Sequence, residues 1–275
     1  MNQVIYHVTF PHIGLDFQIS PVAFTVFGMD IYWYGVIIAA GFALAAFYVY
    51  SQCKKVHIDV NSASDAIFVG LFCAIIGARL YYVIFDPSGY FFEHPLEIVS
   101  IHKGGLAIYG GIIGGLLGGG ITARKKRIPL RSLFDIIMIG FLIGQGIGRW
   151  GNFTNQEAFG TVTDFVLGMS SEATNNLTVH PCFLYESIWC LVGALVLHIF
   201  NTKYKKYDGQ NLLLYLIWYG SERFFLEGIR TDSLYIPFMH LRISQVVAFV
   251  TVIVSIGLMI YMSRKLKGVT HDEHN

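Results

Sequence analysis

The chain has 275 residues, of which 54% are hydrophobic and 13% charged, and its mean hydropathy is +0.55. A soluble protein carries about 25% charged residues, so this composition excludes an ordinary soluble domain and indicates an integral membrane protein. The formal net charge of +1 points to no particular partner. Alternation of apolar and polar residues with period two is not evident, so strands are not expected and a helical bundle is favoured over a β-barrel.

Apolar segments recur along the chain at lengths that suit a bilayer. A transmembrane helix needs about 20 apolar residues, and five segments approach this length while two are shorter. We therefore predict an all-α integral membrane protein, a single multi-pass domain over 1–275 with about seven transmembrane helices. Residues 1–30 are expected at the outer interface and 150–180 in an outer loop. The expected spans are 31–50, 66–85, 105–123, 133–149, 182–200, 212–227 and 243–262.

Lysine and arginine are concentrated in every second loop. Basic clusters follow the first, third, fifth and seventh expected spans. Because basic loops stay in the cytoplasm, we expect the N-terminus outside and the C-terminus in the cytoplasm. The remaining basic residues lie on the outer side, where the positive-inside rule does not explain them. We therefore expect them to bind an anionic ligand. They are Arg79, Lys103, Arg149, Arg223, Arg230 and Arg242.

The segment GRWGNFTNQEAFG, residues 148–160, is the most informative part of the chain, and we call it the signature segment. An arginine at the centre of a membrane helix costs roughly 2.5 to 3.5 kcal/mol. The simpler interpretation is an arginine that reaches the interface beside amides that cap a helix end. The segment holds more hydrogen-bonding side chains than a cap requires, which favours a polar site at one membrane face. They are Arg149, Asn152, Asn155, Gln156 and Glu157.

Charged residues also punctuate three other expected spans. Arg223, Glu227 and Arg230 are spaced i, i+4 and i+7, so they are expected to share one helical face, either as an internal ion pair or with one guanidinium free for a phosphate. Glu186 lies near a helix start, where the helix dipole alone could explain it or where it could have a functional role. Arg79 is expected to pair with an acid or to face a wet cavity.

Glycine and cysteine patterns are interpreted as structural. Glycines recur every fourth residue in 110–119 and 140–148, which is typical of close helix packing, although a groove lined by glycine could also admit an acyl chain. The four cysteines show no metal-like spacing, and Cys182 and Cys190 are too far apart along one helix to form a disulfide. The N-terminal residues lack a basic region and a cleavage site, so no removable signal peptide is expected.

Familiar catalytic motifs are absent from the sequence. It contains no HExxH, no GxSxG, no phosphate-binding loop and no acidic cluster suited to Mg²⁺. Arginines, amides, tyrosines and a few carboxylates at the depth of lipid headgroups remain, and arginine binds phosphate through two parallel hydrogen bonds. A lipid phosphodiester is therefore the expected substrate.

Four ordered motifs resemble one known family. The signature segment is similar to the GRxGNFxNxExxG pattern of prolipoprotein diacylglyceryl transferases, and GGLAIYGG, HPCFLYE and RFFLEGIR match further blocks of that family in the same order, as does the early WYG. The resemblance implies transfer of the diacylglyceryl group from phosphatidylglycerol to the lipobox cysteine of a prolipoprotein, with release of glycerol phosphate. It also implies a bacterial inner (cytoplasmic) membrane enzyme with an outward-facing site and with neither metal nor organic cofactor.

The resemblance also implies roles for individual residues. Arg149 would hold the phosphate of phosphatidylglycerol, with Asn152 and Glu157 shaping the same pocket. Gly160 would meet a backbone requirement in that pocket. Arg223 would stabilise the leaving phosphate, with Glu227 and Arg230 orienting it. Tyr34, from the WYG block, would contact the headgroup.

Tyr109 stands where many members of the family have a histidine. Its motif places it among the catalytic residues, but tyrosine, with a pKa near 10, is a poor base. We therefore do not assign it as the general base. His102 and His180 are alternative bases, although a structural role is favoured for each. Our hypothesis is that Arg149 and Arg223 lower the pKa of the acceptor thiol and stabilise the departing phosphate.

Two other functions fit part of the pattern. A transporter or flippase for an anionic solute or lipid would also use outer arginines and glycine-rich helices. It predicts charges deep on both sides and internal repeats, and neither is found in the sequence. Another headgroup transferase, with an alcohol as acceptor, is the second alternative.

Overall fold

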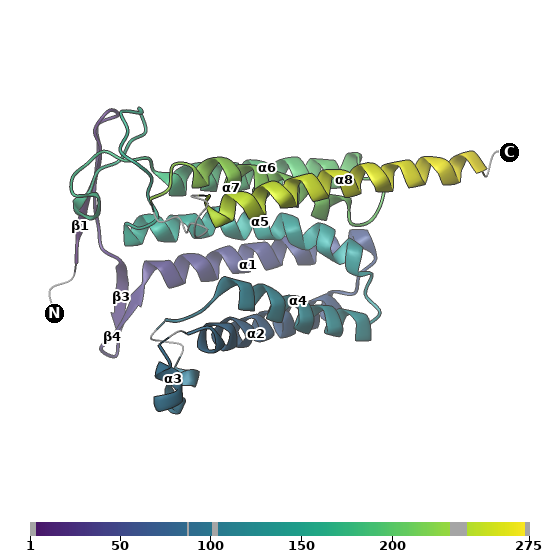
Figure 1. Cartoon of the computed structure of the whole chain (residues 1–275), viewed down its shortest axis with the longest axis horizontal. Coiled ribbons are helices and arrows are strands. Elements are labelled where there is room, and N and C mark those ends of the chain that lie inside the picture. Colours follow the sequence, from purple (N-terminus) through teal and green to yellow (C-terminus); the bar gives the residue numbers. More distant parts are fainter. Residues whose placement is uncertain (1–3, 87, 101–103, 232–240, 273–275) are drawn as a thin grey trace. The chain divides into compact units, whose positions relative to one another are not determined.

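The computed structural model describes residues 4–86, 88–100, 104–231 and 241–272, with side chains up to residue 266. Seven helices of 18 or more residues lie in these ranges, one for each expected span (Figure 1). They are α1 (Trp33–Cys53), α2 (Val60–Ile84), α4 (Ile108–Lys125), α5 (Leu130–Asn155), α6 (Cys182–Lys203), α7 (Gln210–Glu227) and α8 (Ile243–Asp272). Each helix extends past at least one expected boundary, because polar turns continue it beyond the apolar core, whereas α1 and α4 begin two or three residues later than expected.

Within the described residues, five helices are long and apolar enough to cross a membrane. They are α1, α2, α5, α6 and α8. Helices α4 and α7 are not among these five. Helix α4 is rich in glycine and ends in Arg124 and Lys125, and α7 carries Glu222, Arg223 and Glu227. The protein is therefore a multi-pass helical membrane protein, as its composition predicts.

The expectation that the chain lacks strands was wrong for its N-terminal part. Four short strands form two antiparallel hairpins (Figure 1). Strands of four or five residues are too short to show a clear period of two, which explains why the sequence did not reveal them. The strands are β1 (Tyr6–Phe10), β2 (Leu15–Ile19), β3 (Val22–Val26) and β4 (Met29–Tyr32).

The chain divides into two compact units, Met1–Val49 with Asp135–Asn275, and Tyr50–Phe134. In the first unit, α5, α6 and α7 enclose an apolar core. Helix α7 also packs along α8. The residues of this core include Ile139, Leu142, Cys190, Ala194, Leu197 and Tyr215.

Glycines of α5 form a packing face for α1, as their recurrence at every fourth residue predicts. A Cβ atom added at Gly140 would lie 2.9 Å from a methyl group of Val49, and one added at Gly144 would lie 3.6 Å from the carbonyl oxygen of Gly41. The missing side chains allow the two helices to approach closely.

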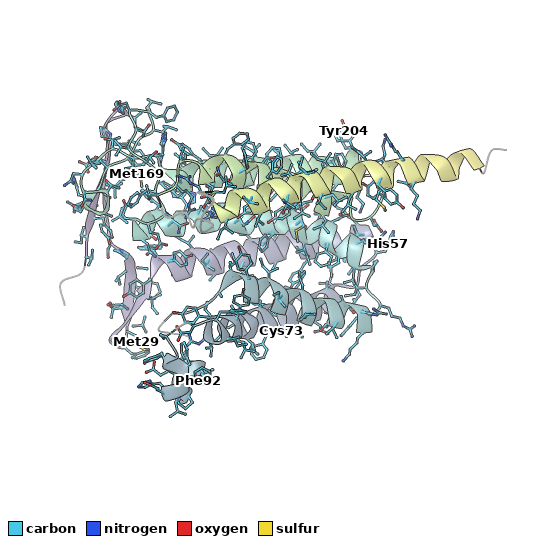
Figure 2. All side chains as sticks on the ribbon, in the orientation of Figure 1. Met29, His57, Cys73, Phe92, Met169 and Tyr204 are labelled. Atoms are coloured by element: carbon cyan, nitrogen blue, oxygen red, sulfur yellow. The ribbon has the colours of Figure 1, made fainter. Side chains whose placement is uncertain are left out.

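The first hairpin packs on the loop between α5 and α6. Thr9 of β1 pairs with Ser170, and a buried apolar cluster joins the strand, the loop and the start of α6. Met169, labelled in Figure 2, lies in this cluster and is 1% exposed. The cluster consists of Val8, Phe10, Met169, Val179 and Phe183. It holds residues 156–181 in place beside the end of α5.

The opposite end of this bundle is fixed by a buried carboxylate. Asp135 of α5 accepts hydrogen bonds from the backbone N–H groups of Gly209 and Leu212 at the start of α7, and its Oδ2 lies 2.9 Å from Nζ of Lys205. The carboxylate of Asp135 therefore caps α7 and compensates the positive charge of Lys205. Tyr204, the residue before Lys205, and Met169 lie at opposite ends of the bundle (Figure 2).

The second unit is built on the pairing of α2 with α4. Added Cβ atoms at Gly110 and Gly114 would lie 2.2 Å from carbonyl oxygens of α2, so only glycine permits this approach. Cys73, labelled in Figure 2, lies on α2 opposite Gly114 and Gly118. The structure thus confirms that the glycines of α4 form a packing face.

Arg79 corrects one expectation from the sequence. Instead of pairing with an acid or facing a wet cavity, it donates hydrogen bonds to main-chain carbonyl oxygens of the segment between α2 and α4, at 2.6 to 2.9 Å. Its guanidinium also lies 5.1 Å from the ring centroid of Phe91. Arg79 therefore ties this segment, which contains α3 (Tyr90–Glu93) and η2 (Pro95–Val99), to α2. The carbonyl acceptors belong to Glu97, Ile98, Gly104 and Gly105.

Candidate functional site

The first half of the signature segment is helical. The expected span ends at residue 149, but α5 continues to Asn155. Arg149 and Asn152 are three residues apart and therefore lie on the same face of the helix. The Arg149 Nη1 donates to Oδ1 of Asn152 at 3.3 Å. The helix thus orients the guanidinium before any ligand is bound.

The second half of the segment folds back on the helix end. Gln156 and Ala158 have positive φ values of 52° and 56°, which reverse the chain direction. The reversal brings Glu157 next to Asn152, whose Nδ2 donates to Oε1 of Glu157 at 2.9 Å, while the backbone N–H of Glu157 donates to the Asn152 carbonyl oxygen. Asn155 makes a longer contact of 3.5 Å to the same carboxylate.

Glu186 lies at the centre of the site. It is 2% exposed, and its Oε2 lies 2.6 Å from Nη2 of Arg149 while its Oε1 lies 3.1 Å from Nη1 of Arg230. One carboxylate on α6 therefore joins an arginine of the signature segment to an arginine after α7. The sequence left open whether the helix dipole or a functional role explains this residue, and the two ion pairs show that it belongs to the site.

Arg223 and Glu227 form the second ion pair. Nη2 of Arg223 lies 2.9 Å from Oε2 of Glu227, as the i, i+4 spacing predicts. The expectation that Arg230 shares this helical face was wrong. Helix α7 ends at Glu227, and Gly228 follows as its C-cap, so Arg230 leaves the helix and turns to Glu186.

Gly160 joins the signature segment to the other chain segments of the site. Its backbone N–H donates to the carbonyl oxygen of His180 at 2.9 Å, and it forms a β-bridge with Arg230. A Cβ atom at this position would lie 2.8 Å from Cβ of His180 and 3.0 Å from Sγ of Cys182. The requirement for glycine is therefore one of space at a place where three segments meet.

Tyr34, near the start of α1, packs against the signature segment. A Cβ atom added at Gly151 would lie 2.7 Å from the tyrosine ring, so the ring covers the α5 backbone at the residue before Asn152. The side chain is 38% exposed. Its position beside the segment is compatible with the expected contact to a headgroup, which stays a prediction.

His180 precedes α6 and is partly buried. Its Nδ1 lies 3.1 Å from the hydroxyl of Tyr185, and burial lowers the pKa of His180 below its ordinary value of 6.5. A neutral imidazole can accept a proton, so the role of base stays a prediction for His180.

Glu222 is a residue that the sequence analysis missed. It is 4% exposed, and its Oε2 lies 3.9 Å from Sγ of Cys190. Arg149, Arg223 and Glu186 all act on it electrostatically, so the two arginines lie near one carboxyl group. In the sequence it is one acid beside an arginine on a helix, which is typical of an exposed ion pair, and only the packing of α6 shows that it is buried.

Three expected residues are not among those of the first unit that the structure describes. Tyr109 is the second residue of α4 in the other unit, where it is 51% exposed and its ring centroid lies 6.4 Å from that of Tyr81. Its role toward the site stays a prediction. His102 and Lys103 lie outside the described residues.

The arrangement suits an anionic ligand. In the described part of the site, three guanidinium groups are paired with the carboxylates of Glu186 and Glu227. A guanidinium fork matches the oxygens of a phosphate, and desolvation strengthens that interaction.

Comparisons with known proteins identify the family. A family model described as prolipoprotein diacylglyceryl transferase matches residues 21–261. A protein of Clostridioides difficile named phosphatidylglycerol--prolipoprotein diacylglyceryl transferase is 42% identical over 256 residues, covering 92% of this chain and 99% of its own length. Relatives of the same name from Finegoldia magna and Staphylococcus aureus are 41% and 37% identical, over 89% and 93% of this chain and 96% and 93% of their own lengths. The chain belongs to the prolipoprotein diacylglyceryl transferase family.

Membership in the diacylglyceryl transferase family confirms the resemblance stated from the motifs. In this structure, three of the four motifs meet in one unit, since the signature segment, HPCFLYE and RFFLEGIR supply Arg149, Glu186 and Arg223 respectively. Arg149 and Arg230, from two of these motifs, both contact Glu186 of the third, although the three residues are distant in the sequence.

Proposed function

We propose that this protein transfers the diacylglyceryl group from phosphatidylglycerol to the lipobox cysteine of a prolipoprotein and releases glycerol phosphate. The observation that carries this proposal is the joining of Arg149, Glu186 and Arg230 in a chain of this family. The relatives' names specify phosphatidylglycerol and prolipoprotein, and a cluster of guanidinium groups suits the phosphodiester of that lipid.

In the proposed reaction, the thiol sulfur attacks the glyceryl carbon that carries the phosphate ester. The carbon–sulfur bond forms as the carbon–oxygen bond to phosphate breaks, and the electron pair leaves with the phosphate oxygen. The thiol proton is released. Arg149 holds the phosphate, oriented by Asn152 and by Glu186. Arg223, oriented by Glu227, faces the negative charge that develops on the leaving group.

A free thiol has a pKa of about 8.5, so only a small fraction is ionised at neutral pH. The field of Arg149 and Arg223 increases that fraction and stabilises the departing phosphate. Glu157, Gly160 and Tyr34 shape the pocket around the headgroup. In this scheme Arg230 acts through Glu186, which fixes the position of Arg149.

The proposal includes a location and a topology. All seven long helices cross the bacterial inner membrane as one multi-pass domain, with the N-terminus outside and the C-terminus in the cytoplasm. The alternation of basic loops supports this orientation, as does the abundance of arginine at the other side. The site then faces outward, where the prolipoprotein arrives, and residues 1–30 and 150–180 lie at the outer surface.

The test uses purified protein in detergent, phosphatidylglycerol and two lipobox peptides that differ only in having Cys or Ser as acceptor. Mass spectrometry of the peptide is expected to show a diacylglyceryl adduct on the Cys peptide alone, and only with phosphatidylglycerol. An adduct on the Ser peptide would point to an alcohol-acceptor transferase. Transport of labelled lipid by folded protein without any adduct would favour the transporter or flippase.

A further inference from the structure

The second hairpin, formed by β3 and β4, has one apolar face and one polar face. Residues directly opposite each other in an antiparallel pair lie on the same face of the sheet. Thr25 is opposite Asp30 on the polar face, where the threonine hydroxyl donates to Oδ1 of the aspartate at 2.7 Å. The residues on either side of this pair point the other way. They form the apolar face, in which Phe24 is opposite Ile31 and Val26 is opposite Met29.

The turn of this hairpin extends the apolar face. Phe27 and Gly28 join the two strands with φ values of 50° and 80°. Turns of this kind usually carry asparagine or glycine, because the left-handed region is unfavourable for a bulky side chain. Phe27 is 98% exposed, so contacts with the described residues do not explain a phenylalanine here. Met29, labelled in Figure 2 at the same end of the hairpin, is 65% exposed.

The two hairpins differ in what covers them. Strand β1 contributes Val8 and Phe10 to the buried cluster on the loop before α6. Every residue of β3 and β4 is exposed or half-buried, and in the described part of the chain these strands pair only with each other. A lone two-stranded hairpin is at best marginally stable in water, and a contiguous exposed apolar patch marks an interaction surface. The apolar face of β3 and β4 therefore requires a surface that covers it.

The membrane is the surface that the connectivity of the chain places beside this hairpin. Strand β4 ends at Tyr32 and α1 begins at Trp33, without an intervening loop (Figure 1). The backbone N–H of Trp33 donates to the carbonyl oxygen of Pro21 at 2.8 Å, so both ends of the hairpin are tied to the first turn of α1. Helix α1 is long and apolar enough to cross a membrane, and it begins with exposed aromatic residues that suit the depth of lipid headgroups. The apolar face thus continues the lipid-facing surface of α1.

The backbone of the hairpin limits how deeply it can enter the membrane. Each strand has one edge without a partner strand in the described part of the chain, and unpaired backbone groups are costly among acyl chains. The polar face, with Thr25 and Asp30, also requires water or headgroups. The boundary between headgroups and acyl chains satisfies both faces of the hairpin at once.

We propose that the β3–β4 hairpin is a membrane anchor, whose apolar face and Phe27 insert among the lipids where α1 leaves the bilayer while the face with Thr25 and Asp30 stays in water. The partner is the lipid surface itself, so the inference does not depend on the transfer reaction. An anchored hairpin fixes the depth of the first turn of α1. This turn holds Tyr34 against Gly151 of the signature segment.

The test measures the depth of two adjacent residues that lie on opposite faces. Met29→Cys and Asp30→Cys are spin-labelled in the full-length protein, which is reconstituted in nanodiscs of phosphatidylcholine and phosphatidylglycerol. Collisions of each label with oxygen, which concentrates in the bilayer, are compared with collisions with a nickel chelate, which stays in water. The ratio of oxygen to nickel collisions is expected to be several-fold higher at position 29 than at position 30. Labelled wild type gives the background from the native thiols of Cys53, Cys73, Cys182 and Cys190.

A charge at the tip provides the second arm of the test. Phe27→Asp is expected to lower the ratio of the label at position 29 toward that at position 30, because a carboxylate opposes insertion. Thr25→Asp, which adds the same charge to the polar face, is the matched control and should leave the ratio unchanged. An unchanged ratio in Phe27→Asp would contradict the insertion of the tip.

Three results at position 29 would overturn the inference. Frequent collisions with the nickel chelate, as at position 30, would place the apolar face in water. Shielding from both oxygen and the chelate would show that protein covers the face. A label that is exposed to water until a prolipoprotein signal peptide is added would make that peptide the partner in place of the membrane.

Discussion

Replacing Glu186 by Gln tests whether the buried ion cluster holds the site together. The carboxylate of Glu186 accepts from Arg149 at 2.6 Å and from Arg230 at 3.1 Å. Removal of one partner from a buried ion pair costs about 3 to 5 kcal/mol, and Gln keeps one acceptor oxygen, so a loss near 3 kcal/mol is expected. For a domain of this size about 1 kcal/mol corresponds to roughly 2 to 4 °C, so the unfolding temperature should fall by roughly 6 to 12 °C.

The assay is thermal unfolding in detergent, followed by intrinsic tryptophan fluorescence, together with the rate of thioether formation. Glu157→Gln is the matched control, because Glu157 is exposed and its main contact, the amide of Asn152, can still be made by Gln. The control should lose less than about 1 kcal/mol. Equal unfolding temperatures for the two variants would refute the claim that Glu186 links α5, α6 and the segment after α7.

Three further predictions concern other residues of the site. Gly160→Ala should lower the free energy of unfolding by about 1 to 3 kcal/mol and abolish most transfer activity, because the new Cβ would lie 2.8 Å from Cβ of His180. Gly144→Ala is the control and should lose less stability and less activity, because its nearest neighbour would be 3.6 Å away. Arg223→Lys should reduce kcat at least about tenfold, because lysine keeps the positive charge but cannot form two parallel hydrogen bonds to a phosphate. Full activity of this variant would contradict the hypothesis that Arg149 and Arg223 activate the thiol and stabilise the departing phosphate. Because burial lowers the pKa of His180, protonation favours the unfolded state as pH falls below 6.5. Wild-type protein should therefore lose more thermal stability between about pH 7 and 5 than His180→Gln, and parallel pH profiles would refute this assignment.

Features that depend on local spacing could be predicted from the sequence. The glycine faces of α4 and α5 and the pair of Arg223 with Glu227 follow from helical periodicity alone, and the structure confirms them. The seven long helices were predicted by apolar length, although only five of those described are long and apolar enough to cross a membrane. Family membership was predicted from four ordered motifs and is confirmed by the matching family model.

Features that depend on a distant partner could not be predicted. Arg79 donates hydrogen bonds to main-chain carbonyl oxygens, and every residue type has such an oxygen, so the sequence pattern cannot identify these partners. The interpretation of Arg79 as a ligand-binding or acid-paired residue was therefore wrong. The end of α7 after Glu227 separates Arg230 from the face predicted for it. The burial of Glu222 results from the packing of α6, and the acid has no local sequence signal.

The most direct test of the account is the mass of a Cys lipobox peptide after incubation with phosphatidylglycerol and Arg149→Ala protein. Arg131→Ala, which removes a charge from a basic cluster of the predicted cytoplasmic side, is the control and should give a diacylglyceryl adduct at the wild-type rate. The account predicts that the folded Arg149→Ala protein gives no adduct, because Arg149 holds the donor phosphate. An adduct formed by Arg149→Ala at the control rate would contradict the central claim that the cluster of Arg149, Glu186 and Arg230 forms the donor site.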